Sequence, residues 1–123
     1  MIIGIGCDVI EIERVKRACE KESFVKRVFT DKEIAYCTSR KAQAFSSYAA
    51  RFAAKEAVLK AFGTGLRNGE IKEIEITNDE LGKPIVVLSG YHKALAEEKG
   101  VQNIHISLSH SQTQAIAYCV MEG

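Results

Sequence analysis

The chain has 123 residues, with 17 Lys and Arg against 16 Asp and Glu and a formal net charge of +1 at pH 7. This length fits one ordinary domain that buries its own core, so we expect a single domain over residues 1–123. The near balance of charge excludes the strongly basic surface typical of nucleic-acid-binding proteins and leaves only local recognition by charge.

The cysteines and the N-terminal residues both bear on the cellular location of the protein. The four cysteines are scattered from Cys7 to Cys119 without a Cys-x-x-Cys pair, which argues against a zinc site and against a secreted disulfide framework. The apolar run at the N-terminus has no basic leader and stops at Asp8, so it is neither a signal peptide nor a membrane span. We therefore expect reduced thiols and a cytoplasmic location.

Residues 2–10 predict a buried strand, because the run is short, apolar and rich in β-branched residues. Asp8 interrupts this apolar run. It either ends the strand and caps the helix that follows, or it is a metal ligand. The run by itself leaves both interpretations open.

Residues 11–21 have the period of an amphipathic helix, and residues 24–29 favour a second short helix. The basic side chains of the first helix gather on one exposed stripe, formed by Arg14, Arg17 and Lys21. Such a stripe is either a solvated face or a docking surface for an acidic partner.

Two more helices are predicted between residues 30 and 62. Thr30-Asp31-Lys32-Glu33 matches a capping box and opens a helix that runs to about Ser39. A long helix follows from about Lys41 to Phe62, where Gly63-Thr64-Gly65 ends it. Gly63 either only caps the helix or also lets a ligand approach the backbone, and a lone Gly-x-Gly does not distinguish the two.

The long helix is apolar on two sides and nevertheless carries four charges close together. A helix of this kind is usually buried between neighbours, so its charges need partners, a ligand or a metal. Glu56 and Lys60 share one stripe, whereas Arg51 and Lys55 share another. The plain interpretation is two ordinary helix-surface pairs, and the alternative is a functional site.

The pattern changes to strands after residue 70. Residues 71–77 and 84–88 predict a hairpin whose second strand opens at the single proline. A short helix over residues 91–99 precedes a second hairpin, formed by residues 103–111 and 115–121. We therefore expect an α+β domain in which about five mainly antiparallel strands form one sheet that packs on the long central helix.

Polar side chains gather at the end of the predicted strand 103–111. Strand alternation puts His105, Ser107 and Ser109 on one face, with His110 and Ser111 at the end. These residues show neither a metal-ligand spacing nor a nucleophile elbow. They form either a plain turn or a set of donors that holds phosphate oxygens.

Three motifs together resemble one known family. They are Gly4-Ile5-Gly6-Cys7-Asp8, the run from Arg51-Phe52-Ala53-Ala54-Lys55-Glu56-Ala57 through Lys60-Ala61-Phe62-Gly63-Thr64-Gly65, and Ser107-Leu108-Ser109-His110-Ser111. In this order and spacing the chain closely resembles the 4′-phosphopantetheinyl transferases, specifically the short holo-acyl-carrier-protein synthases. The resemblance spans nearly the whole chain, and the first two motifs are specific as a pair.

The resemblance implies a reaction and a set of site residues. The reaction transfers the 4′-phosphopantetheine arm of coenzyme A to a serine of apo-acyl carrier protein, releases adenosine 3′,5′-bisphosphate and requires Mg²⁺. The family's metal carboxylates map onto Asp8 and Glu56, and its lysine near the phosphates maps onto Lys60. Contacts with the nucleotide end of coenzyme A map onto Arg51 and Lys55. The resemblance also implies a homotrimer with active sites between subunits, which would explain a helix that is apolar on two sides.

The expected site is completed by residues from the other motifs. Asp8, Glu56 and Lys60 are the expected catalytic residues, and coenzyme A is also expected to contact Lys60, Gly63, Ser109 and His110. Carrier-protein docking is expected at Arg14, Arg17 and Lys21, and we expect no nucleic acid or membrane partner. Two alternatives remain open: a non-enzymatic carrier-binding module that needs neither Mg²⁺ nor coenzyme A, and another metal-dependent phosphate enzyme such as a hydrolase.

Overall fold

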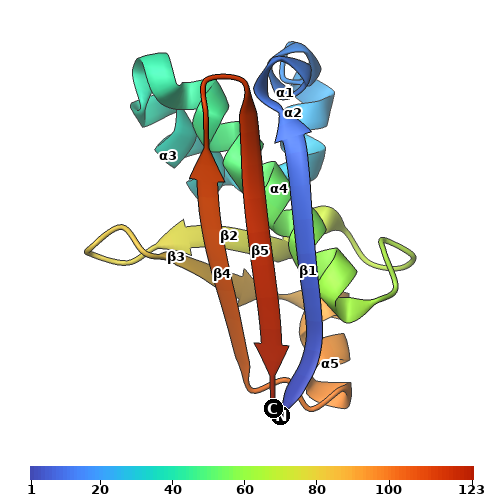
Figure 1. Ribbon diagram of the computed structural model, residues 1–123. Coiled ribbons are helices and arrows are strands. Elements are labelled where there is room, and N and C mark those ends of the chain that lie inside the picture. The colour runs from blue at the N-terminus through green and yellow to red at the C-terminus, as the bar shows by residue number, and fades with distance from the viewer.

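A long helix, α4 (Ala44–Phe62), lies at the centre of the computed structural model, which describes residues 1–123 (Figure 1). The elements before it are β1 (Ile2–Glu11), α1 (Ile12–Ala18), α2 (Glu22–Val28), α3 (Asp31–Ser39) and the 3-10 turn η1 (Lys41–Gln43). Those after it are the 3-10 turn η2 (Ile71–Glu73), β2 (Ile74–Asn78), β3 (Pro84–Leu88), α5 (Gly90–Glu98), β4 (Asn103–His110) and β5 (Gln114–Glu122). The predicted α+β class, with five antiparallel strands and a long central helix, is confirmed.

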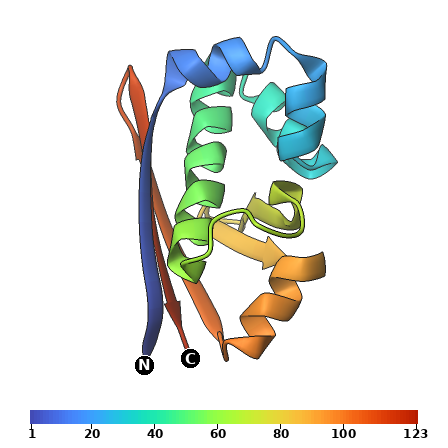
Figure 2. The ribbon, with the colours of Figure 1, turned by 90° about the vertical axis from the view of Figure 1, so that its right-hand side faces the viewer.

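The strands form two sheets, so the expectation of one sheet was wrong. One sheet has three antiparallel strands in the order β1-β5-β4, and the other is the β2-β3 hairpin. Helix α4 lies between them, with the three-stranded sheet on one side and the hairpin with α2 and α3 on the other (Figure 2). The edge of β2 that does not pair with β3 forms hydrogen bonds with side chains and not with a further strand. Glu33 accepts from the N–H of Ile76, and Lys55 donates to the carbonyl of Ile74.

Strand β1 is an edge strand with one open face, so the prediction of a buried strand was wrong. Its side chains alternate between the helix α4 and solvent, and Ile5 and Val9 are 68% and 58% exposed. Ile116 and Tyr118 of β5 continue this open face and are 38% and 56% exposed. The three-stranded sheet therefore presents apolar side chains on the side that α4 does not cover.

Two glycines let β1 lie directly on the backbone of α4. A Cβ atom added at Gly4 would stand 2.0 Å from the carbonyl oxygen of Ala61, and one at Gly6 would stand 2.0 Å from that of Ala57. Any side chain at either position would force the strand away from the helix. This close approach is what brings the next part of β1, with Asp8, beside the last turns of α4.

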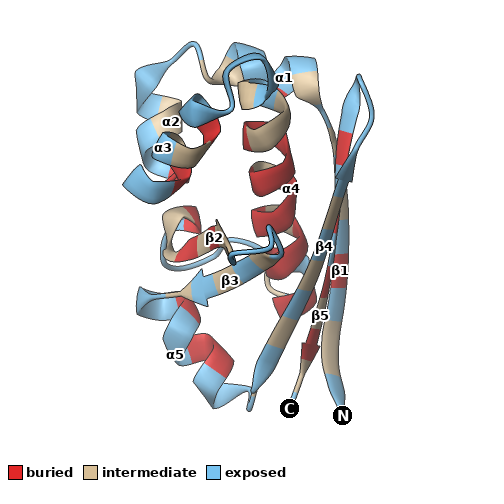
Figure 3. Cartoon of the chain, turned by 90° about the vertical axis from the view of Figure 1, so that its left-hand side faces the viewer, coloured by how far each residue is buried: buried red, intermediate tan, exposed pale blue.

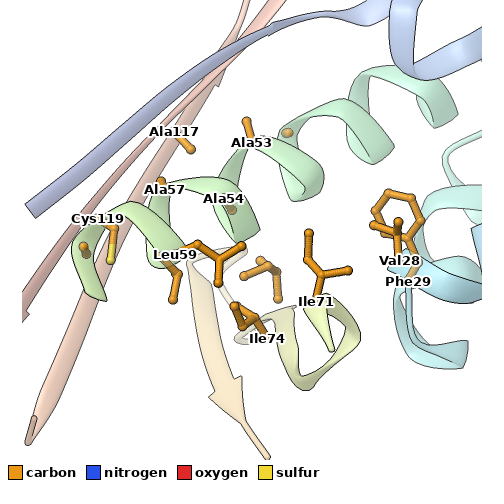
Figure 4. Close-up of a cluster of buried hydrophobic side chains, with 14 of the residues drawn as sticks. Val28, Phe29, Ala53, Ala54, Ala57, Leu59, Ile71, Ile74, Ala117 and Cys119 are labelled. Carbon is orange, nitrogen blue, oxygen red and sulfur yellow. The ribbon is translucent and has the colours of Figure 1, made fainter. Parts of the chain in front are cut away.

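The core follows α4 along most of its length, and Figure 3 shows buried residues on nearly every turn of it. Small side chains face the three-stranded sheet, where Ala53 and Ala57 lie near Ala117 of β5 (Figure 4). Larger side chains fill the opposite side, where Leu59 lies near Ile74. The helix ends at Gly63, whose φ of 80° is the left-handed conformation expected for a glycine C-cap. None of the helices combines the length and the apolar character that crossing a membrane requires.

Candidate active site

Asp8 of β1 and Glu56 of α4 line one cavity of about 370 Å³. The close packing of Gly6 on α4 places these two carboxylates together, although 48 positions separate them in the sequence. The other lining residues are Val9, Ile10, Arg14, Val15, Ala18, Phe24 and Phe52. The cavity therefore has an apolar wall, two acids and one arginine.

The surroundings of Glu56 disfavour its ionisation. Burial raises the pKa of Glu56, the negative charge of Asp8 raises it further, and the charge of Lys60 works in the opposite direction. Asp8 pairs with Lys60, whereas Glu56 forms no ion pair within the chain. A bound cation would stabilise the charged form of Glu56.

Lys60 supplies a positive charge beside Asp8. Its ammonium group donates to Oδ1 of Asp8 at 3.0 Å and to the carbonyl oxygen of Cys7 at 3.0 Å. The hydrogen bond to Asp8 is the largest cause that raises the pKa of Lys60. The Lys60 side chain is 55% exposed, so it can swing from Asp8 toward a ligand without a rearrangement of the core.

These residues fit a hard divalent cation. No group of three or more His, Cys, Asp and Glu side chains lies together anywhere in the chain, so the protein offers two carboxylates at most in one place. Mg²⁺ suits such a site, because it prefers oxygen ligands, keeps several waters and completes its shell with phosphate oxygens of a substrate. Zinc and other metals that need four protein ligands in a closed site do not fit here.

The stripe formed by Arg51 and Lys55 points away from this cavity, toward β2. Lys55 is completely buried, pairs with Glu33 at 2.8 Å and donates to the carbonyl of Ile74 at 2.6 Å. Protein atoms enclose the Lys55 ammonium on all sides. The expected contact of Lys55 with coenzyme A therefore does not fit the structure. Glu33 was missed as its partner, although the capping box that it closes with Thr30 was recognised and is confirmed.

Arg51 lies one turn before Lys55 and is 4% exposed. Its guanidinium stands 4.0 Å from the centre of the Tyr36 ring and donates to the side-chain oxygen of Asn78. Its Nε is buried and has no hydrogen-bond partner in the chain. A buried N–H without a partner is costly, and a ligand oxygen would satisfy it. The expected contact of Arg51 with coenzyme A stays a prediction.

The remaining expected coenzyme A contacts do not all lie beside Asp8 and Glu56. Gly63 directly follows the helix turn of Lys60, and its N–H donates to the Lys60 carbonyl at 3.0 Å. Ser109 and His110 lie on β4, which β5 separates from β1. His110 lines another cavity, of about 460 Å³, together with Gln43 and Ser46. One chain therefore does not bring Ser109 and His110 to the Asp8–Glu56 cavity.

The predicted basic stripe does not lie on one helix, because Arg14 and Arg17 lie on α1 and Lys21 lies beyond its end. Helix α1 ends at Ala18, earlier than the predicted end, and Lys21 is the N-cap of α2. Arg14 lines the Asp8–Glu56 cavity, whereas Arg17 and Lys21 line an adjacent cavity of about 520 Å³. Arg27, also on the second cavity, was not among the expected docking residues.

Comparison with known proteins identifies the family of the chain. The family model described as the 4′-phosphopantetheinyl transferase superfamily matches residues 4–119. The holo-[acyl-carrier-protein] synthase of Ruminiclostridium cellulolyticum is 53% identical over 120 residues, which are 95% of this chain and 90% of the relative.

Two solved structures have the same fold. The holo-[acyl-carrier-protein] synthase of Neisseria meningitidis superposes with a TM-score of 0.91 at 32% identity and covers 100% of both chains. That of Bacillus anthracis, solved in complex with CoA (3′,5′-ADP), gives a TM-score of 0.82 at 36% identity and covers 98% of this chain and 96% of its own. The chain therefore belongs to the 4′-phosphopantetheinyl transferase superfamily and, within it, to the holo-[acyl-carrier-protein] synthases.

Proposed function

We propose that this chain transfers the 4′-phosphopantetheine arm of coenzyme A to a serine of apo-acyl carrier protein, giving holo-acyl carrier protein and adenosine 3′,5′-bisphosphate. The observation that carries this proposal is the meeting of Asp8 and Glu56 at one cavity, with Lys60 hydrogen-bonded to Asp8. Relatives that match along nearly the whole chain are named holo-[acyl-carrier-protein] synthase, and one such structure was solved in complex with CoA (3′,5′-ADP). We further propose that residues 1–123 act as one catalytic domain.

The chemistry is a displacement at phosphorus. The serine oxygen of the carrier forms a bond to the phosphorus that bears the pantetheine arm, and the bond from this phosphorus to the bridging oxygen of the pyrophosphate breaks. The electron pair leaves with adenosine 3′,5′-bisphosphate, and the serine proton passes to a carboxylate of the site or to water.

The two carboxylates and Lys60 have different roles in this displacement. Asp8 and Glu56 would hold Mg²⁺ from opposite elements, and the ion would offset the negative charge of the pyrophosphate. Lys60 would leave Asp8 and donate to the leaving phosphate, where negative charge grows in the transition state. Its exposed side chain permits this movement.

The carrier protein is proposed to dock on the basic residues of α1 and the loop that follows it. Arg14 lines the carboxylate cavity itself, so a partner held by Arg14, Arg17 and Lys21 would present its serine next to Asp8 and Glu56. An acidic helix beside the acceptor serine, as the family's carriers have, would complement this surface.

Assembly into a homotrimer with shared sites is also proposed. The open face of the three-stranded sheet presents Ile5, Val9, Ile116 and Tyr118 to solvent in the single chain. Burial of such a continuous apolar face against another copy is favourable. A neighbouring copy would also bring a second β4, with its Ser109 and His110, toward the Asp8–Glu56 cavity. The cytoplasmic location expected from the sequence stays a prediction.

The decisive experiment is mass spectrometry of an apo-carrier protein after incubation with the chain, coenzyme A and Mg²⁺. A gain of one phosphopantetheine arm, absent for a carrier whose acceptor serine is replaced by alanine, is the expected result. A carrier-binding module would bind without any gain of mass. A hydrolase would release phosphate or cleave coenzyme A when no carrier is present, and either result would contradict the proposal.

A further inference from the structure

A buried ionic network joins three elements behind the site. The ammonium of Lys55 on α4 pairs with Oε1 of Glu33 on α3 at 2.8 Å, and both side chains are completely buried. The remaining polar atoms of this pair bond to backbone. Oε2 of Glu33 accepts from the N–H of Ile76 at 2.8 Å, Oε1 accepts from that of Thr30 at 2.8 Å, and Lys55 donates to the carbonyl of Ile74 at 2.6 Å.

A second layer of contacts repeats this arrangement one helical turn away. Arg51 lies four residues before Lys55 on α4, Tyr36 lies three residues after Glu33 on α3, and Asn78 lies two residues after Ile76 on β2. Arg51 stacks on Tyr36 and donates to Asn78. The same three elements therefore meet twice, first around Lys55 and then around Arg51.

The two layers differ in what they leave unsatisfied. Every charged atom of the Glu33–Lys55 layer has a partner inside the chain. In the Arg51 layer, the buried Nε of Arg51 has none. The first layer is thus complete without a ligand, whereas the second keeps one buried donor without a partner.

Stability alone does not explain why charges occupy the first layer. A buried ion pair loses much of its attraction to desolvation, and apolar residues of the same volume often stabilise a protein as well or better. What the pair adds is direction, because its bonds to Ile74 and Ile76 fix β2 along the axis of α4 in a way that apolar packing does not.

We propose that Glu33 and Lys55 are positioning residues for the nucleotide end of coenzyme A: they hold β2 and α3 in place against α4, so that the guanidinium of Arg51 is fixed between Tyr36 and Asn78 for contact with the ligand. This inference rests on the proposed function, since it takes coenzyme A as the ligand of Arg51. In this inference Lys55 does not contact the ligand and instead helps to position Arg51, which does.

The test removes both charges at once with the double variant Glu33→Gln and Lys55→Met, which leaves no unpaired buried charge. Calorimetry with adenosine 3′,5′-bisphosphate reads the site without any turnover. We expect its dissociation constant and the KM for coenzyme A to rise about tenfold, while kcat stays within about twofold, because uniform binding is lost and not transition-state binding. Glu33→Gln alone is the milder variant. It should show the same change in smaller measure, since Gln keeps the length of Glu33 and one acceptor oxygen, and Lys55 keeps its bond to the carbonyl of Ile74.

Two comparisons separate positioning from general stability. Glu73→Gln is the matched control, because Glu73 forms a similar pair with the buried His92 at 2.8 Å. The Glu73 side chain bonds neither to Arg51 nor to the free edge of β2. This variant should lower the melting temperature and leave ligand binding unchanged. In the Arg51→Met background, the pair variants should have no further effect on the dissociation constant.

The outcomes distinguish this inference from the proposed function. If the wild-type chain binds adenosine 3′,5′-bisphosphate and modifies the carrier, but Glu33→Gln binds it as tightly as wild type, the pair is only structural. The same conclusion follows if the pair variants raise the dissociation constant by the same factor in the wild-type chain and in the Arg51→Met background. If the wild-type chain neither binds the nucleotide nor modifies the carrier, the proposed function itself fails.

Discussion

Asp8 and Glu56 are the two carboxylates that the cavity places next to each other, and their removal should abolish transfer without unfolding the chain. Asp8→Asn or Glu56→Gln takes away one ligand of the proposed ion and also removes one of two neighbouring negative charges. We expect a loss of at least about 10²-fold in kcat, with an unchanged or higher melting temperature. Carrier modification followed by mass spectrometry, together with thermal unfolding, checks both parts. Wild-type turnover that survives an excess of chelator would contradict the metal role.

Lys60 has a role that kinetics can separate from its ion pair with Asp8. Lys60→Met keeps the aliphatic part of the side chain and deletes the charge, so it removes one donor to the transition state, which typically costs about 10² to 10³ in rate. The loss should appear in kcat and leave the melting temperature unchanged, because the side chain is largely exposed. Lys93→Met, on the exposed surface of α5, is the control. Near-normal kinetics with a lower melting temperature would mean that the Asp8–Lys60 pair is purely structural.

At the scale of elements, the fit of β1 on α4 depends on the absence of a side chain at Gly6. Gly6→Ala would place a methyl group 2.0 Å from the Ala57 carbonyl oxygen and 2.7 Å from the backbone nitrogen of Ala61. Because backbone atoms cannot give way like the end of a side chain, we expect a destabilisation of about 3 kcal/mol, the upper part of the usual range for overpacking. Activity should fall as well, since Asp8 follows on the same strand.

Gly82→Ala is the matched comparison for Gly6→Ala. Gly82 has a φ of 89°, and nothing lies within 4 Å of an added Cβ, so it carries backbone strain without a clash. We expect a cost of about 1 kcal/mol there. Urea unfolding of both variants gives the comparison. An equal or smaller cost for Gly6→Ala would show that β1 does not need this close approach.

Elements fixed by neighbouring residues could be predicted from the sequence, and those fixed by distant partners could not. Thr30 and Glu33 are three residues apart, and the capping box they form is confirmed. The second oxygen of the same Glu33 bonds to Ile76, which lies 43 residues away, and no local pattern announces that contact. The division into two sheets follows from such contacts, because alternation predicts strands but not which edges pair.

The same limit applies to the candidate site. Helical period correctly separated the stripe of Glu56 and Lys60 from that of Arg51 and Lys55. It could not tell which stripe opens to a cavity, because that depends on where β1 and β2 lie against α4. Lys55 was consequently expected at a ligand and is instead a buried partner of Glu33. Asp8 was recognised as a candidate because an acid in an apolar strand needs a reason.

For the whole molecule, the open face of the three-stranded sheet predicts assembly. We expect sedimentation of the wild-type chain as a trimer. Tyr118→Lys should give a monomer that stays folded, because Tyr118 is 56% exposed in the single chain. Transfer should be lost in the monomer if a neighbouring copy supplies Ser109 and His110. A wild-type monomer that is fully active at the assay concentration would remove both the trimer and the shared site.

The last prediction concerns the surface that receives the carrier protein. Arg14 lines the carboxylate cavity, Arg17 and Lys21 line the adjacent one, and an acidic carrier helix is the partner that this charge would select. Charge complementarity acts mainly on encounter and orientation, and it is screened beyond about 8 Å at physiological salt. Arg14→Glu with Arg17→Glu should therefore raise the KM for the carrier about tenfold at low salt, with a smaller difference as salt increases.

The KM for coenzyme A should stay nearly unchanged in this double reversal, and so should the fold. Arg17 makes only an exposed pair with Glu13 at 3.7 Å, which contributes little to stability. Lys93→Glu on α5 adds the same kind of charge reversal away from the cavities and should leave carrier kinetics as in the wild type. If the double reversal leaves the carrier KM unchanged at low salt, Arg14 and Arg17 form an ordinary solvated face. The carrier would then have to dock elsewhere, and the basic surface around Lys26, Arg27 and Arg40 is the next one to reverse.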